Sequence, residues 1–80
     1  MSTVLEEVER RTTNLYGTGS AVSVDKEEGG WVVRCWDRHG IEKDTTGKPR
    51  AKAGAITIMK RRLARANFLR LNEQDGGDDE

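Results

Sequence analysis

The first apolar residues of the chain recur every three or four positions, which is the spacing of one side of an α-helix. Thr3 and Glu6 stand three residues apart, as in a capping box, where the hydroxyl and the carboxylate accept hydrogen bonds from free backbone amides. Gly17 favours the end of a helix. The pattern therefore predicts a helix between Thr3 and Gly17 with a buried stripe of Leu5, Val8, Thr12 and Leu15.

After this helix the apolar positions alternate, which is the pattern of half-buried β-strands. Ser20–Asp25 carries Val22 and Val24 on one face. Lys26–Gly30 has the polar and glycine-rich composition of a hairpin loop. Trp31–Asp37 is the strongest strand pattern in the chain. One of its faces carries Trp31, Val33 and Cys35, and the other carries Val32, Arg34 and Trp36.

Asp37–Gly40 has aspartate first and glycine last, which favours a type I turn. Ile41–Asp44 then predicts a short third strand. Pro49 disfavours helix at the residue before it, Lys48. The segment from residue 46 to Pro49 is therefore expected to be irregular.

A second helical pattern begins at about Ala51 or Lys52 and ends at Leu71. Its apolar sector contains Ala55, Ile56, Met59, Leu63 and Ala66, while Arg61, Arg62 and Arg65 cluster on the other side. Residues 73–80 are acidic, polar and rich in glycine, so they are expected to form a disordered tail.

The elements predict an α+β domain in the order helix, two or three antiparallel strands, helix. Both helices would pack their apolar stripes on one sheet face, in a single domain of residues 1–72 followed by the acidic tail 73–80. The other face, with Val32, Arg34 and Trp36, would have little to cover it. Because an 80-residue chain has a small core, a homodimer would be one way to gain burial.

Charge is strongly segregated although the formal net charge is zero. Residues 1–44 sum to −3 and residues 73–80 to −5, whereas residues 45–72 hold eight basic residues and no acidic one. The eight are Lys48, Arg50, Lys52, Lys60, Arg61, Arg62, Arg65 and Arg70. Such segregation creates a local positive field that the overall charge hides.

Catalytic and metal-binding patterns are missing from the sequence. Cys35 is the only cysteine and His39 the only histidine, so neither a disulfide nor a cysteine-cluster zinc site is possible within the chain. Cys35 is expected in the core and His39 in a solvated turn. Gly47-Lys48 lacks the upstream glycine of a phosphate-binding loop. We expect no enzyme activity, no cofactor and no small-molecule substrate.

Location follows from the same features. A lone cysteine suits a reducing cytoplasm, and no apolar run approaches the roughly 20 residues that span a membrane. We therefore expect a cytoplasmic protein without membrane contact.

The candidate binding residues are cationic or aromatic. Lys48, Arg50, Lys52, Arg61, Arg62 and Arg65 would follow a phosphate backbone or an acidic protein surface, and Arg34 with Trp36 would offer a stacking surface on the sheet. The alternative is that Arg61, Arg62 and Arg65 are neutralised within the molecule. Their partners would then be Glu6, Glu7 and Glu9, or the acidic tail.

The element order, the strand Trp31–Trp36 and the basic run Lys48–Lys52 before the last helix resemble the double-stranded RNA-binding domain. The resemblance spans roughly residues 3–71 and is one of topology. It implies that the basic run contacts phosphates across a groove. The chain departs from the family in two places. Pro49 and Ala51 separate the cations where the family has a lysine pair, and the loop after Asp25 is acidic.

These observations favour a non-catalytic binding module for nucleic acid or for a nucleic-acid-processing complex. The alternative is a protein-interaction or inhibitor module that forms a homodimer and binds an acidic protein surface. The small size and the lack of a catalytic pattern would suit a module encoded by a virus or mobile element.

Overall fold

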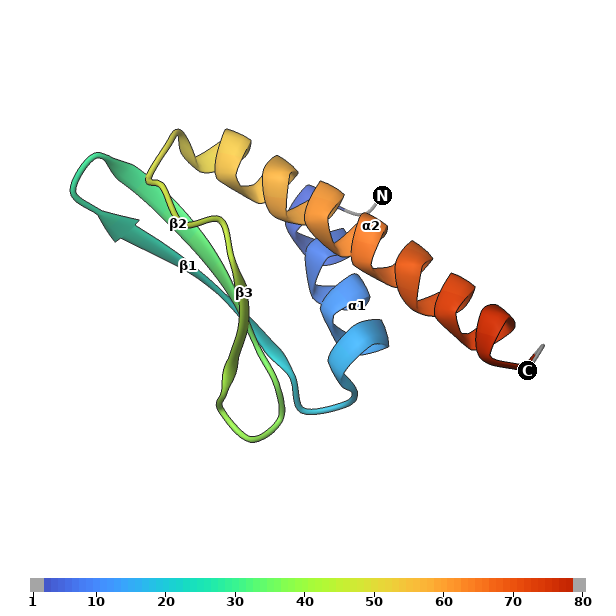
Figure 1. Cartoon of the computed structure of the whole chain (residues 1–80). Coiled ribbons are helices and arrows are strands. Elements are labelled where there is room, and N and C mark those ends of the chain that lie inside the picture. Colours follow the sequence, from blue (N-terminus) through green and yellow to red (C-terminus); the bar gives the residue numbers. More distant parts are fainter. Residues whose placement is uncertain (1–2, 79–80) are drawn as a thin grey trace.

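Two helices and one three-stranded sheet form the fold of the computed structural model (Figure 1). Residues 3–78 are described, with side chains described as far as Leu71. The elements follow in the order α1 (Val4–Tyr16), β1 (Ala21–Glu27), β2 (Gly30–Trp36), β3 (Glu42–Thr45) and α2 (Lys52–Asp78). The predicted α+β order is therefore confirmed, and the third strand is present.

The start and end of α1 follow its sequence signals. The Glu6 amide donates to the Thr3 hydroxyl and the Thr3 amide donates to the Glu6 carboxylate, both at 3.1 Å, which completes the predicted capping box. At the other end, the Gly17 amide donates to the Thr13 carbonyl at 2.8 Å, with Gly17 at a φ of 89°. Local sequence alone is enough to set both ends of this helix.

The sheet is antiparallel with the strand order β1-β2-β3. Val24 pairs with Val33 and Val22 pairs with Cys35, so these apolar side chains share one face. The hairpin turn is shorter than the predicted loop, because β1 continues to Glu27 and pairs there with Gly30. The turn itself is only Glu28-Gly29.

Both helices lie on the same face of the sheet and contact each other, with α1 against β1 and α2 against β2. The fully buried cluster between the two layers consists of Val8, Val33, Cys35, Ala55, Met59 and Leu63. All six belong to the apolar faces that the periodicity predicts. The placement of both helices on one sheet face is confirmed.

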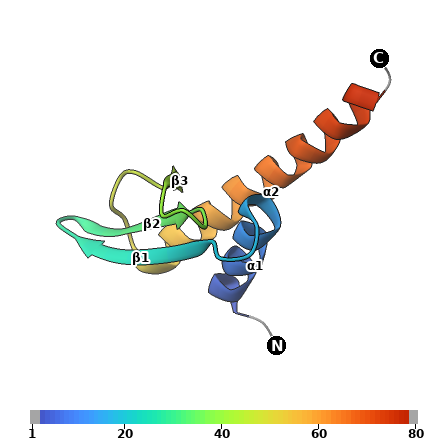
Figure 2. The same ribbon diagram turned by 90° about the horizontal axis from the view of Figure 1, so that it is seen from below.

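The second helix is longer than predicted and projects from the rest of the molecule. It continues to Asp78 rather than ending at Leu71, since residues 72–75 include no strong helix breaker. Figures 1 and 2 both show its C-terminal part standing clear of α1 and the sheet. The expectation of a disordered tail concerns residues 73–80, which lie outside the residues whose side chains are described.

Candidate binding surface

The start of α2 is attached to the end of the sheet by a short backbone bridge. The Trp31 amide donates to the Arg50 carbonyl at 2.7 Å, and the Arg50 amide donates to the Trp31 carbonyl at 3.2 Å. This bridge holds the run that contains Lys48, Arg50 and Lys52 against the first residues of β2. We call these three residues the α2-start cations.

The α2-start cations have no carboxylate partner among residues 3–71. The Lys52 ammonium lies over the Trp31 ring, 4.9 Å from its centre. The Arg50 Nε donates to the Lys48 carbonyl at 3.1 Å. These contacts orient two of the cations without neutralising their charge, because a ring and a carbonyl carry no net charge.

The first turn of α2 also lacks the capping groups that α1 has. The Ala55 amide donates to the Ala51 carbonyl at 2.9 Å, which makes Ala51 the N-cap residue. An alanine side chain cannot accept a hydrogen bond from the amides of the first turn, and no acidic residue lies in that turn. The positive end of the helix dipole is therefore left without a side-chain anion beside the α2-start cations.

One negative charge lies close to this end of the molecule. The hairpin turn approaches the same segment, since a β-carbon added to Gly29 would lie 3.6 Å from the Pro49 β-carbon. Glu28 is exposed in that turn. Its carboxylate lowers the positive potential around the α2-start cations. This agrees with the sequence, in which the loop after Asp25 is acidic, unlike that of the double-stranded RNA-binding domain.

Arg61 and Arg65, two of the predicted binding residues of α2, lie on a different side of the helix from Lys52. Arg61 and Arg65 are exposed and form no ion pair with residues 3–71. Lys52 and Arg61 are nine residues apart, which is two and a half helical turns, so they point to opposite sides of α2. The six cations expected to act together are therefore not one continuous surface.

Arg62 is separated from Arg61 and Arg65 by a contact with β3. Its guanidinium donates to both carboxylate oxygens of Asp44, with Nη2 to Oδ1 at 2.6 Å and Nε to Oδ2 at 3.1 Å. This pair raises the pKa of Arg62 above its usual value. The prediction that Arg62 clusters with its two neighbours is wrong, because the pair with Asp44 holds it toward the sheet.

The glutamates of α1 bind a different cation from those expected. The Lys60 ammonium lies 2.8 Å from the Glu7 carboxylate, and this hydrogen bond lowers the pKa of Glu7. Glu7 also lies 4.0 Å from Arg10 on its own helix. Among the described residues, Glu6 and Glu9 form no ion pair with the arginines of α2.

Arg34 lies on the sheet face away from the helices and is surrounded by carboxylates. Its guanidinium contacts Glu27 at 2.6 Å, Asp25 at 2.8 Å and Glu42 at 3.3 Å. Hydrogen bonds to Glu27 and Asp25 raise the pKa of Arg34. One cation among three carboxylates leaves this cluster with a local excess of negative charge, which does not suit a polyanion.

Trp36 and Val32 on this face are not an open stacking surface either. Val32 is fully buried, and the expectation that little covers it is wrong. The Trp36 Nε1 donates to the Ser23 hydroxyl at 3.0 Å, and this hydroxyl donates to Asp25 at 3.0 Å. Trp36 is half-buried. Because Asp25 also contacts Arg34, a polar network runs from the Trp36 indole to the Arg34 guanidinium. This network occupies the surface that the sequence suggested for binding.

Replacing Arg34 with methionine is expected to lower the thermal midpoint, because three carboxylates then face one another without their shared cation. Thermal unfolding at about 0.05 and about 1 M NaCl measures this, and the higher salt should recover part of the loss by screening the repulsion. Arg38→Met is the matched control, since Arg38 is exposed and, among residues 3–71, its side chain hydrogen-bonds only His39 and forms no ion pair. Equal midpoints for the two variants would contradict the role given to the network.

Cys35 and His39 lie where the sequence predicts. Cys35 is fully buried with its sulfur 3.4 Å from the Thr12 hydroxyl, and burial raises the pKa of its thiol. His39 is exposed in the turn after Asp37, whose carboxylate accepts from the His39 and Ile41 amides. No metal-binding group of three or more side chains is found among the described residues. In the described part, no helix is both long and apolar enough to cross a bilayer.

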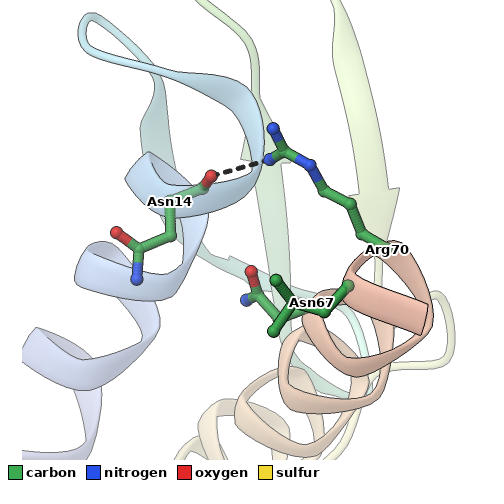
Figure 3. A pocket seen from close by; sticks show the side chains of 4 residues that line it. Asn14, Asn67 and Arg70 are labelled. Atoms are coloured by element: carbon green, nitrogen blue, oxygen red, sulfur yellow. Dashed lines mark hydrogen bonds between the residues drawn. The ribbon is translucent and has the colours of Figure 1, made fainter. Parts of the chain in front are cut away.

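A shallow pocket of about 340 Å³ lies where the end of α1 meets α2, lined by Asn14, Asn67, Arg70 and Leu71 (Figure 3). The Arg70 guanidinium reaches across it and donates to the Asn14 carbonyl at 2.9 Å and to the Leu15 carbonyl at 3.2 Å. A cation on the last carbonyls of α1 favours the negative end of that helix dipole. Arg70 is therefore explained by the stability of the fold.

Sequence reasoning missed two features of this surface. The first is the absence of a capping residue before Lys52. It could have been inferred from the sequence, because an alanine such as Ala51 cannot cap a helix. The bridge between Trp31 and Arg50 left no signal, since it depends on where the chain returns to the sheet. Comparisons with protein-family models, with curated proteins and with solved structures find no match for this chain.

Proposed function

We propose that this chain is a non-catalytic binding module that holds phosphates of a nucleic acid at the start of α2. The observation that carries the proposal is the coincidence of two features at one place. Lys48, Arg50 and Lys52 have no carboxylate partner among residues 3–71, and the adjacent helix begins without a capping side chain. A phosphate would accept hydrogen bonds from the amides and neutralise the cations at the same time.

The chemistry of this surface favours contact with the backbone of a nucleic acid rather than with its bases. Lysine and arginine on phosphates give affinity and orientation without reading sequence. Lys52 is already positioned over Trp31, and the Arg50 side chain is oriented by its hydrogen bond to the Lys48 carbonyl. Less conformational entropy is then lost on binding than with fully mobile side chains.

Replacing Lys48, Arg50 and Lys52 together with alanine is expected to weaken nucleic-acid binding by about tenfold or more. It should also lower the slope of log affinity against log salt by about 2 to 3, because each contacted phosphate contributes about 0.9 to that slope. Fluorescence anisotropy with labelled duplex RNA, duplex DNA and single strands between about 50 and 200 mM salt measures both quantities.

The matched control removes three exposed cations elsewhere, Arg10, Arg38 and Lys43, with the same change in net charge. This variant should keep the salt slope of the unsubstituted protein. The proposal fails if the unsubstituted protein binds none of these nucleic acids at about 50 mM salt, or if the control variant loses as much affinity as the first.

A second candidate function is the binding of an acidic protein surface by the same α2-start cations. The observation that favours it is the small extent of the group, since Arg61, Arg62 and Arg65 point elsewhere or are paired. Three cations within five residues would be satisfied by a short acidic peptide. Competition by a poly-glutamate peptide, with no binding of any nucleic acid, would select this function over the first.

A further inference from the structure

Two arginines stand on the side of α2 opposite Lys52. Arg61 and Arg65 are both exposed, and among residues 3–71 neither forms an ion pair or a side-chain hydrogen bond. They are four residues apart, so their side chains are neighbours on one side of the helix. Because α2 has no acidic residue before Glu73, no carboxylate on the described side chains of α2 offsets these two charges.

Phe68 continues the same side of α2 beyond the two arginines. It follows Arg61 by seven residues and Arg65 by three, which places all three within a sector of about 60° around the helix axis. Phe68 is 61% exposed, so much of its ring is open to solvent. The pocket against α1 is lined by Asn67 and Arg70 of the same turn (Figure 3). This turn therefore meets α1 through residues other than Phe68.

We infer that Arg61, Arg65 and Phe68 form a contact site for single-stranded nucleic acid, in which the arginines bind phosphates and the ring stacks on a base. A single strand offers both groups, because its backbone is anionic and its bases expose their faces. In a duplex those faces are covered by neighbouring base pairs, which leaves the ring without a base to stack on. A carboxylate-rich peptide would satisfy the arginines alone.

The spacing along α2 fits a short stretch of strand. The distance from Arg61 to Phe68 along the helix axis is about 10 Å, which is roughly three nucleotides at the spacing of a stacked strand. The planar guanidinium of arginine can donate two hydrogen bonds to one phosphate. Since the C-terminal part of α2 stands clear of α1 and the sheet (Figures 1 and 2), a strand can lie along it without meeting either.

The inference rests on the proposed function for the class of ligand, a nucleic acid, but it uses a separate surface. Arg61 lies on the opposite side of α2 from Lys52 and about 13 Å further along the axis. Substitutions can therefore remove the α2-start cations and this second site one at a time.

The first test measures the fluorescence anisotropy of a labelled thymidine strand of about ten nucleotides with the full chain. Phe68→Leu keeps an apolar side chain and removes the ring. It should weaken binding at least about fivefold, the low end of what the loss of one stacked base costs, and leave the salt slope unchanged. An abasic strand with the same number of phosphates should bind the variant and the unsubstituted chain equally. Ile41→Ala is the control, because Ile41 is similarly exposed (58%) but precedes β3.

The second test removes the two charges. The double variant Arg61→Gln with Arg65→Gln should bind the strand more weakly. Its slope of log affinity against log salt should fall by about 1.4, because each contacted phosphate of a single strand contributes about 0.7. Glutamine at two other exposed arginines, Arg10 and Arg38, makes the same change in net charge and should leave the slope as it is.

The pattern across the variants separates this inference from the proposed function. If alanine at the α2-start cations weakens nucleic-acid binding while the Phe68 and Arg61/Arg65 variants do not, the proposed function stands and this inference is overturned. The reverse pattern supports this site and rejects the α2 start. Binding of a poly-glutamate peptide through Arg61 and Arg65, with no binding of the thymidine strand, would also overturn the inference and assign this side to an acidic protein.

Discussion

Replacing Gly30 with alanine is expected to destabilise the fold by about 2 to 6 kcal/mol, from strained backbone and forced overlap together. Gly30 has a φ of 141°, where a residue with a side chain is strained. An added β-carbon would lie 2.5 Å from the Arg50 carbonyl oxygen and 2.7 Å from the Arg50 nitrogen. Relieving that overlap would pull Arg50 away from Trp31 and break the bridge. Urea unfolding measures the loss.

The matched control is Gly40→Ala. Gly40 also has a positive φ, 78°, but a β-carbon there would meet nothing within 4 Å. Its cost is therefore limited to the backbone conformation, about 1 to 2 kcal/mol. The difference in the free energy of unfolding between the two variants therefore measures how closely Gly30 of β2 approaches Arg50. Equal losses would mean that the start of α2 is not held against β2.

Replacing Met59 with alanine is expected to cost about 2 to 5 kcal/mol, as for other large buried side chains. Met59 is fully buried in the cluster shared by both helices and the sheet. A domain of this size is stabilised by only about 4 to 12 kcal/mol in total, at roughly 0.05 to 0.15 kcal/mol per residue. The variant should therefore unfold at a clearly lower urea concentration, as followed by circular dichroism.

Met59→Leu separates the effect of volume from that of the methionine side chain itself. Leucine nearly fills the same space, so its cost should be less than about 1.5 kcal/mol. Ala53→Gly is an exposed control on the same helix, limited to helix propensity at about 1 kcal/mol. A Met59→Ala loss as small as this control would contradict the position of Met59 at the centre of the core.

The fold places opposite charge on two surfaces. The outer face of the sheet holds Arg34 among three carboxylates, while the start of α2 holds three cations without such partners among residues 3–71. The sheet face is therefore expected to repel a polyanion and the α2 start to attract it. Under the proposed function, a polyanion would therefore approach the α2 start rather than the outer face of the sheet.

The sequence by itself determined the order of the elements, the ends of α1 and most of the core. The capping box at Thr3, the alternation in β2 and the apolar sector of α2 each depend on neighbours a few residues away. Hydrogen bonds and burial that involve residues close in sequence impose a regular spacing of polar and apolar residues, which can be recognised without the structure. The absence of a cap at Ala51 was visible in the same way, and Cys35 was correctly assigned to the core.

Only the tertiary structure decided which charged groups meet. Arg62 and Asp44 are 18 residues apart in sequence, Lys60 and Glu7 lie on different helices, and Arg34 reaches Glu27 and Glu42 on two other strands. Long charged side chains have many carboxylates within reach, and the choice among them depends on strand register and helix packing. Periodicity indicates which side of α2 is polar, but the fold determines which cations on that side already have a partner.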